Sequence, residues 1–171
     1  MYFHIMQKIQ IYDSPLGKLT FVSDSLALTG IWFDKQEPLQ QILKAPHEVC
    51  NLPIFDETRL WFDTYFNGQQ PGFIPRLSLI GTAFRQQVWR NLQLIPYGET
   101  TSYGTLAKQI GQQLGKNKMS AQAIGGAVGN NPISIIVPCH RVVGTNGTMT
   151  GYAGGIWRKE FLLDLEAKNR R

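Results

Sequence analysis

The segment Ile133-Ser134-Ile135-Ile136-Val137-Pro138-Cys139-His140-Arg141-Val142-Val143 places a cysteine beside a histidine at the end of an apolar run. A thiol attacks as the thiolate, so a base within hydrogen-bond reach is what makes it reactive near neutral pH. Successive side chains on a strand point to opposite faces, so the two can act together only if the strand ends at Pro138 and the backbone turns there. The alternative is that Cys139 is an inert core residue.

Upstream of this segment, the first part of the chain has the pattern of an antiparallel meander. Apolar or alternating stretches cover residues 8–12, 18–22 and 27–33, and turn-forming residues separate them. Residues 56–68 then predict a helix, because Asp56 can cap its start, acidic residues lie in its first turn and Gly68 marks its end. We therefore expect a small antiparallel sheet packed with one helix.

A linker is expected over residues 69–75, which contain two prolines and a glycine. The length of 171 residues allows one good core or two small ones. We predict an α/β (α+β) protein with an N-terminal domain over residues 1–80 and a second domain over residues 81–171.

The second domain shows the pattern of three successive helices. Thr82, Ser102 and Ser120 are each placed to cap a helix. Apolar residues recur every four positions in the first two helices, at Phe84, Val88 and Leu92 and at Leu106, Ile110 and Leu114. The last two helices and the turn between them predict a helix-turn-helix.

The third of these helices is unusual because it contains Gly125 and Gly126. A glycine in a helix interior costs about 1 kcal/mol relative to alanine. Such a cost indicates that another backbone approaches closely, either a neighbouring strand or the wall of a DNA groove.

The two predicted domains differ in charge. Residues 1–80 hold six basic and eight acidic residues, a net charge of −2, whereas residues 81–171 hold eleven and four, a net charge of +7. A basic half is the pattern expected for binding a phosphate backbone, although it is also compatible with an ordinary solvated surface.

Further motifs lie on either side of the Cys139-His140 pair. Asn130-Asn131-Pro132 precedes the pair, Tyr152-Ala153-Gly154-Gly155 follows it, and Glu166 lies near the end of a short amphipathic helix. Together with residues 13–19, 101–104 and 158–163, these motifs resemble the O6-alkylguanine-DNA alkyltransferases, or methylated-DNA–protein-cysteine methyltransferases, over nearly the whole chain. The Pro-Cys-His-Arg-Val motif is the most specific of them.

The resemblance implies a ribonuclease-H-like N-terminal domain and a DNA-binding, alkyl-transferring C-terminal domain. It implies DNA repair by direct, single-turnover transfer of an alkyl group from O6-alkylguanine to Cys139, after the base has been flipped out of the duplex. Whether O4-alkylthymine is also repaired stays open. The product is a thioether that no motif here could cleave, so each molecule is expected to react once, without a cofactor.

The resemblance also implies catalytic roles. His140 would deprotonate Cys139 through a bound water and would be oriented by Glu166. The Tyr103 hydroxyl would donate to a ring nitrogen of the guanine, and Asn131 would brace the loop that carries the cysteine. From the residues alone, Glu166 could equally be a surface residue of its helix, and Asn131 a turn former ahead of a proline.

Other residues would bind the flipped base. In the family, the carbonyl at the position of Val142 accepts from the exocyclic amine, and the backbone N–H at the position of Ala153 donates to the exocyclic oxygen. Many relatives carry serine instead of Ala153, but a main-chain contact survives that change. Tyr152 and Val128 would line the pocket.

The third helix would enter the minor groove. The residues expected to contact DNA are Gln122, Ala123, Gly125, Ala127, Arg141, Lys116 and Lys118. Most relatives place an intercalating arginine at the position of Gln122, and the turn over residues 111–119 is several residues longer than usual. Either the neutral glutamine wedges less strongly, or Lys116 and Lys118 recover the lost charge by binding phosphate; we favour the second.

Metal, membrane and partner expectations follow from what the sequence contains. Outside the Cys139-His140 pair, the histidines and cysteines are His4, His47 and Cys50, short of the four ligands usual for a closed zinc site, so we predict no metal. No apolar stretch approaches the ~18 residues of a spanning helix, and the N-terminus lacks signal-peptide features. We expect a cytoplasmic protein that binds no membrane, and the resemblance implies a monomer that binds double-stranded DNA containing alkylated bases.

Two other functions remain as alternatives. A cysteine hydrolase with a Cys/His dyad would also use Cys139 and His140, but it would turn over. A DNA-binding module that flags damage would keep the helix-turn-helix but lack the reactive cysteine. A zinc-dependent nucleobase deaminase is excluded, because the sequence has no Cys-x-x-Cys pair.

Overall fold

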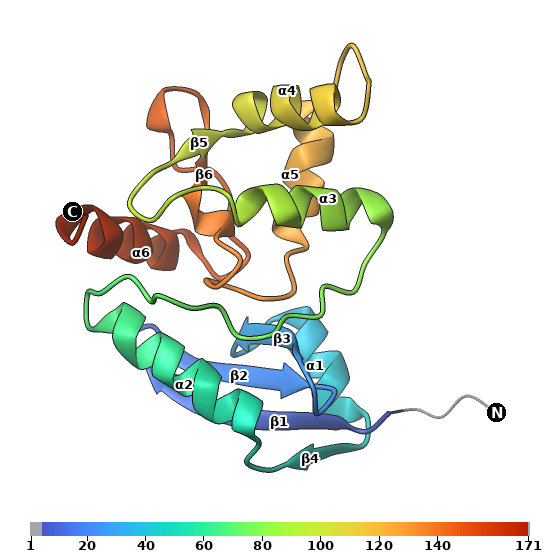
Figure 1. Cartoon of the computed structure of the whole chain (residues 1–171), viewed down its shortest axis with the longest axis vertical. Helices are drawn as coiled ribbons and strands as arrows, with labels where there is room; N and C mark the ends of the chain where they lie inside the picture. Colours follow the sequence, from blue (N-terminus) through green and yellow to red (C-terminus); the bar gives the residue numbers. More distant parts are fainter. Residues whose placement is uncertain (1–4, 171) are drawn as a thin grey trace. The chain divides into compact units, whose positions relative to one another are not determined.

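The structure, a computed structural model, describes residues 5–170. It divides into two compact units whose boundary falls between Leu79 and Ile80 (Figure 1). Within the described residues, no helix is long and apolar enough to cross a membrane.

The first unit is built on a mixed four-stranded sheet of order β3-β2-β1-β4. β1 (Gln7–Ser14), β2 (Gly17–Ser23) and β3 (Leu28–Phe33) form the predicted antiparallel meander. The fourth strand, β4 (His47–Val49), was not predicted; it pairs with β1 in parallel, so the sheet is mixed. A parallel strand needs a crossover connection, and the segment that contains α1 (Glu37–Lys44) provides it.

The long helix of this unit, α2 (Pro53–Phe66), begins three residues before the predicted Asp56 cap. Leu52 is the N-cap and makes no side-chain cap hydrogen bond. Pro53 can start the helix because its fixed φ is already helical and its missing N–H would be unpaired there anyway. Asp56 lies in the first turn, and Gly68 follows the helix end with φ +80°.

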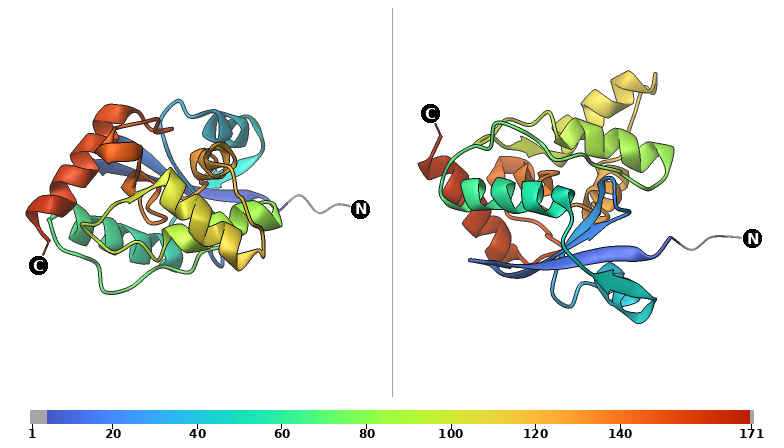
Figure 2. Two further views of the ribbon diagram at one scale, coloured as in Figure 1. Left: turned by 90° about the horizontal axis from the view of Figure 1, so that it is seen from above. Right: turned by 60° about the horizontal axis from the view of Figure 1, so that its bottom comes forward.

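The two helices of the first unit cover opposite faces of the sheet, as the right-hand view of Figure 2 shows. On one face, Tyr12 and Phe21 pack against Phe62 of α2, with ring centroids 5.4 to 5.6 Å apart. On the other face, Leu39 of α1 closes a small cluster with Ile9, Val22 and Trp32. The aromatic side chains of α2 are therefore mostly core: Phe55, Trp61, Phe62 and Tyr65 are buried, and Phe66 at the helix end is half-buried.

The second unit contains α3 (Ala83–Leu92), α4 (Tyr103–Gln113), α5 (Ala121–Gly129) and α6 (Ile156–Lys168). The three predicted caps are confirmed, since Thr82, Ser102 and Ser120 each accept a hydrogen bond from a backbone N–H in the first turn. Leu114 was expected on the apolar face of α4 but is the C-cap residue and is 42% exposed.

Specific hydrogen bonds fix α3 against the helix-turn-helix formed by α4 and α5. The Trp89 indole N–H donates to the Ala127 carbonyl (2.9 Å). The Asn91 and Gln113 side-chain amides donate to each other, both at 2.9 Å. A two-stranded parallel sheet of β5 (Thr101–Ser102) and β6 (Val142–Val143) then joins the start of α4 to the segment after Cys139.

Candidate active site

The apolar run before Cys139 forms a tight turn and not the expected strand. Backbone N–H groups of Ile136 and Val137 donate to the carbonyls of Ser134 (2.9 Å) and Ile133 (3.1 Å). Ile135 has φ +71°, a left-handed conformation that is rare for a β-branched residue. The chain does turn after Pro138, because Cys139–Arg141 is a single 3-10 turn.

Asn131 ties this turn together. Its amide donates to the Val137 carbonyl (2.8 Å), and its side-chain oxygen accepts from the Ile133 N–H (3.0 Å). Both bonds lie inside the loop between α5 and Cys139, and Asn131 is 8% exposed. It therefore does more than form a turn before Pro132, since it crosslinks the two ends of the loop.

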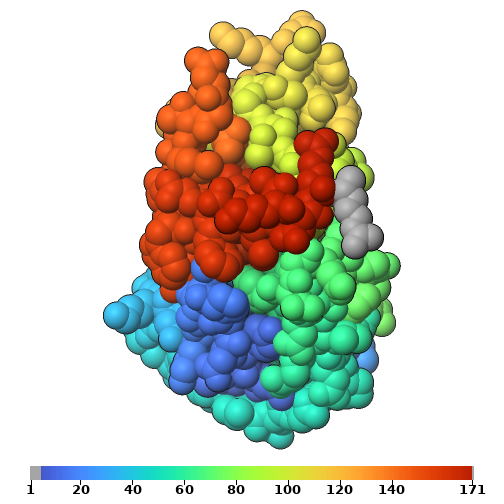
Figure 3. All heavy atoms as spheres, turned by 90° about the vertical axis from the view of Figure 1, so that its left-hand side faces the viewer, coloured from blue at the N-terminus to red at the C-terminus, as the bar shows by residue number. Residues whose placement is uncertain are grey.

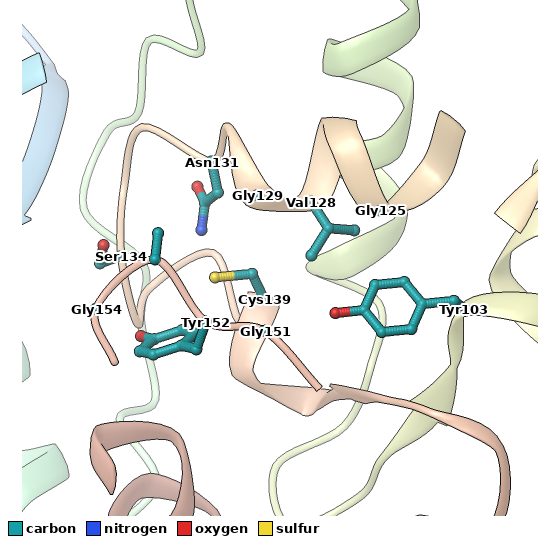
Figure 4. A pocket seen from close by; sticks show the side chains of 11 residues that line it. Tyr103, Gly125, Val128, Gly129, Asn131, Ser134, Cys139, Gly151, Tyr152 and Gly154 are labelled. Carbon is teal, nitrogen blue, oxygen red and sulfur yellow. The ribbon is translucent and has the colours of Figure 1, made fainter. Parts of the chain in front are cut away.

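The Cys139 side chain opens into a cavity of about 270 Å³ (Figure 4). Its lining includes five other residues of the predicted site, namely Tyr103, Val128, Asn131, Tyr152 and Ala153. Glycines 125, 129, 151 and 154 complete the wall, together with Ser134, which the sequence reasoning did not single out. The volume is close to the ~300 Å³ of small ligand pockets, which suits one planar heterocycle.

The Cys139 thiol is protonated at rest. Burial raises its pKa, and this outweighs the opposing effects of a hydrogen bond from Asn131 and the positive charge of Lys159. Because the attacking species is the thiolate, the proton must leave during the reaction. A neighbouring base is therefore required.

His140, the next residue in the chain, has the chemistry of such a base. Its ring is fully buried, and Nε2 lies 2.7 Å from Glu166 Oε1. Burial lowers the pKa of His140, although Glu166 opposes the shift, so the imidazole is neutral at neutral pH. Because a carboxylate only accepts, Nε2 carries the hydrogen and Nδ1 is left as an acceptor. Nδ1 has no hydrogen-bond partner among the described residues.

Glu166 is an ionised carboxylate in the interior. Oε2 accepts from the Gly98 N–H (3.1 Å) and from Arg141 Nε (2.9 Å), and Oε1 accepts from Arg141 Nη2 (3.0 Å). Burial alone would raise the pKa of Glu166, but the hydrogen bonds and charges of His140 and Arg141 hold it well below its usual range. Glu166 is thus not a surface residue.

Arg141 is placed differently from its prediction. It was expected to contact DNA, but its guanidinium points inward, onto Glu166 and onto the Ile95 carbonyl through Nη1 (2.7 Å). Its side chain is 11% exposed. It belongs to the buried ion pair, and its contact with DNA stays a prediction.

Lys159 is a second buried cation, and sequence reasoning missed it. Its side chain is inaccessible to solvent, and Nζ donates to the carbonyls of Val142 (2.5 Å) and Thr150 (2.9 Å). Burial lowers its pKa. A signal was present, because Lys159, Leu162 and Glu166 are spaced by three and four positions and form the buried face of α6. The Val142 carbonyl has a second lone pair that can accept another hydrogen bond.

Tyr103 lies at the start of α4 with its hydroxyl directed toward Cys139 (Figure 4). Burial raises its pKa, and a hydrogen bond with the Thr150 side chain partly offsets the shift. Its hydroxyl is therefore a neutral donor at the cavity. The Tyr152 hydroxyl is buried and has no hydrogen-bond partner within residues 5–170.

The predicted DNA-contacting residues of α5 divide into two groups. Gln122 and Ala123 are exposed and Gly125 is half-buried. Ala127 is only 3% exposed, and its backbone carbonyl accepts from the Trp89 indole of α3; its contact with DNA stays a prediction. A Cβ on Gly126 would meet nothing within 4 Å, so no neighbouring strand explains that glycine.

The turn between α4 and α5 projects from the second unit, as Figures 1 and 3 show. Lys116 and Lys118 lie on it and are both exposed. Gly115 has φ +66° and allows the Lys116 N–H to reach back to the Gly111 carbonyl (2.8 Å).

A metal site was not expected. Residues 5–170 contain no cluster of three His, Cys, Asp or Glu side chains that could hold an ion. His4, named above as a possible ligand, lies outside the described residues.

Comparison with known proteins places both units in one family. Residues 8–77 match the ribonuclease-like domain of 6-O-methylguanine DNA methyltransferase, and residues 83–168 match its DNA-binding domain. The chain is 46% identical to a methylated-DNA–protein-cysteine methyltransferase of Haemophilus influenzae over 91% of its own length and 83% of the relative. It is 42% identical to that of Methanosarcina acetivorans, over 91% and 96%.

Solved structures agree. The O6-methylguanine methyltransferase of Mycobacterium tuberculosis superimposes with a TM-score of 0.83 at 41% identity and covers 97% of this chain and 96% of its own. A structure of the M. tuberculosis protein in complex with DNA gives the same TM-score and identity over 95% and 94%. This chain therefore belongs to the O6-methylguanine DNA methyltransferase family.

Proposed function

We propose that Cys139 is the residue through which this methylated-DNA–protein-cysteine methyltransferase repairs O6-alkylguanine in DNA. The observation that supports this assignment is the buried thiol at the wall of a base-sized cavity, next to a neutral histidine held by an ionised glutamate. Cys50, the other cysteine, is half-buried in the first unit, away from this arrangement.

The reaction is a displacement at the alkyl carbon. The Cys139 proton passes to Nδ1 of His140 through a bridging water, and the sulfur attacks the alkyl carbon. A carbon–sulfur bond forms while the carbon–O6 bond breaks, and the bonding electrons move into the guanine ring. The Tyr103 hydroxyl donates a hydrogen bond to the ring nitrogen that gains this charge, which stabilises the leaving group.

The cavity walls position the base. The Ala153 N–H faces the exocyclic oxygen, the Val142 carbonyl takes the exocyclic amine, and Tyr152 and Val128 cover the ring faces. Asn131 keeps the cysteine loop in place and lowers the proton affinity of the thiol through its hydrogen bond. The product is a thioether, so the protein is consumed in one turnover.

Mass spectrometry tests the acceptor. After exposure to a duplex that contains O6-methylguanine, the intact chain should gain one methyl group, and peptide mapping should place it on Cys139. Cys139→Ser should gain none, while the matched variant Cys50→Ser should react like the parent. Methyl on Cys50, or product released in excess of protein, would contradict the assignment; the second result would favour a cysteine hydrolase.

For the partner, we infer double-stranded DNA bound by the exposed side of α5 and the projecting turn. Gln122 would fill the gap left by the flipped base, and Lys116 and Lys118 would bind phosphates. Binding should weaken with salt, with a log–log slope of roughly −0.9 per phosphate neutralised. The chain is expected to act as a monomer, since the residues that line the cavity come from one unit of one chain. A cytoplasmic location is expected because a reactive thiol needs a reducing compartment.

Two sets of substitutions separate these roles. Gln122→Ala should slow repair of duplex more than reaction with free O6-methylguanine. Lys116→Ala with Lys118→Ala should weaken DNA binding without changing thiol reactivity, whereas Lys18→Ala with Lys44→Ala, a matched pair in the first unit, should not. Normal DNA binding by the first lysine pair would refute charge compensation by the turn.

A further inference from the structure

Arg141 makes more contacts inside the protein than a residue with a DNA-binding role would need. Nε and Nη2 form a fork on the Glu166 carboxylate, at 2.9 and 3.0 Å, and Nη1 donates to the Ile95 carbonyl at 2.7 Å. The guanidinium carbon also lies 5.7 Å from the ring centroid of Tyr97. The guanidinium is therefore held in one orientation from three sides.

The same carboxylate holds His140. Glu166 Oε1 accepts from both His140 Nε2 and Arg141 Nη2, so any movement of the carboxylate moves the imidazole too. A two-point fork resists rotation of a carboxylate in a way that a single donor does not. Arg141 thereby determines which oxygen faces the histidine.

Arg141 also places a positive charge beside the Glu166 carboxylate. The titratable groups around His140 and Glu166 are Arg141, Lys159, Cys139, Tyr97 and Tyr152. Of the two cations, Lys159 donates to backbone carbonyls, whereas Arg141 is in direct contact with the carboxylate. Arg141 is thus the cation that neutralises Glu166 at close range.

We propose that Arg141 is a positioning residue for alkyl transfer: it fixes and neutralises Glu166 so that His140 stays uncharged and keeps Nδ1 available for the thiol proton. The inference rests on the role proposed above for His140. Without the guanidinium, the negative charge of Glu166 would act on His140 uncompensated and would favour the imidazolium, whose Nδ1 already carries a proton.

Loss of Arg141 is expected to raise the pKa of His140. Burial lowers the pKa of His140, Glu166 opposes this, and Arg141 adds to the lowering. Loss of Arg141 should therefore move the titration of His140 to higher pH. The reaction should then be slowed most at lower pH and recover as the pH rises.

Two variants and a control test the proposal. Arg141→Gln removes the charge but keeps one donor for Glu166, Arg141→Lys keeps the charge but loses the fork, and Arg90→Gln changes an exposed arginine on α3. For each, NMR follows the titration of the His140 ring in the full chain, assigned by comparison with His140→Gln. The rate of Cys139 methylation by free O6-methylguanine is measured against pH, and affinity is measured for an undamaged duplex.

We expect Arg141→Gln to raise the pKa of His140. It should also slow Cys139 methylation at least about tenfold near neutral pH, since a general base typically contributes about 10²- to 10⁴-fold. Arg141→Lys keeps the charge, so it should bring the pKa of His140 closer to the parent value than it brings the rate of Cys139 methylation. Arg90→Gln should match the parent in both. DNA affinity should stay unchanged in both Arg141 variants. If Arg141→Gln does not fold, the Arg141→Lys comparison decides alone.

An unchanged His140 pKa in folded Arg141→Gln would overturn the proposal, and so would a parent rate of Cys139 methylation in Arg141→Lys. Reduced DNA affinity with a normal reaction of the free base would also overturn it, in favour of a DNA contact. Failure of the proposed function gives a different result: His140→Gln would then react with the free base at the parent rate.

Discussion

Glu166→Gln is the most informative single change at the buried ion pair. Glutamine preserves the size of the side chain and one carbonyl acceptor, but it removes the negative charge and presents an amide to donors. Glu166 and Arg141 have side chains 1% and 11% exposed, so water cannot replace the lost interactions. The variant leaves a buried guanidinium without its counter-charge.

The buried position of the ion pair determines how much stability Glu166→Gln should lose. Removal of one partner of a buried ion pair is typically destabilising by about 3–5 kcal/mol, because the remaining charge stays buried. We expect Glu166→Gln to lower the free energy of unfolding by about this amount at neutral pH. An exposed pair provides a control: Glu99 lies 3.1 Å from Arg170, and both side chains are about half exposed. Such pairs contribute about 0–1 kcal/mol.

Urea denaturation of the parent, Glu166→Gln and Glu99→Gln measures both values. Because the pKa of Glu166 is held well below its ordinary value, its stabilisation is fully present above that ordinary value and is lost only as the pH falls through the folded one. The difference between parent and Glu166→Gln should therefore persist through mildly acidic pH. A loss no larger than that of Glu99→Gln would refute the reasoning.

The other predictions concern the cysteine loop, pH and a helix cap. Asn131→Ala should leave the Ile133 N–H unpaired and remove one of the two hydrogen bonds to the Val137 carbonyl, which still accepts from the Cys139 N–H; it should cost about 1–3 kcal/mol in urea denaturation and slow methylation of Cys139, and retention of the parent rate would argue against the brace. Because burial lowers the pKa of His140, stability should fall as the pH drops below ~6.5, where the unfolded chain binds the proton first, and His140→Gln should flatten this dependence of the melting temperature. Ser120→Ala should cost about 1 kcal/mol by removal of the α5 cap, which urea denaturation can check against the parent. Lys159→Met should raise the pKa of the Cys139 thiol, seen as a shift to higher pH in its alkylation by iodoacetamide; an unshifted profile would show that the ammonium does not act on the sulfur.

Local signals in the sequence predicted local structure well. The caps at Thr82, Ser102 and Ser120 are confirmed because each depends on a side chain and an N–H three residues away. β4 was missed for the opposite reason: it has three residues and pairs with β1 about 40 positions earlier. Nothing in so short a stretch distinguishes a strand from a loop.

The site shows the same division between local and distant contacts. Motif resemblance brought the cavity residues together, since Tyr103, Asn131 and Tyr152 do line it with Cys139. It did not indicate the partners that Arg141 and Ala127 have inside the protein, because those partners are set by tertiary packing. The direction of the Arg141 side chain depends on Glu166, 25 residues away, and no feature of the Pro-Cys-His-Arg motif distinguishes an arginine that faces DNA from one that faces inward.

The inward face of α6 explains why chemistry and folding are coupled in this unit. Lys159 and Glu166 sit on that face with Leu162 between them, so hydrophobic burial alone cannot hold the helix in place. The helix packs stably when carbonyls accept from the Lys159 ammonium and donors bind the Glu166 carboxylate, because unpaired buried charges cost several kcal/mol each. Those partners are Val142, Thr150, His140, Arg141 and Gly98, which also shape the alkyl-transfer site. Substitutions on this face should therefore change stability and thiol reactivity together, whereas substitutions on the exposed side of α5, such as Gln122→Ala, should change the binding and repair of duplex more than thiol reactivity.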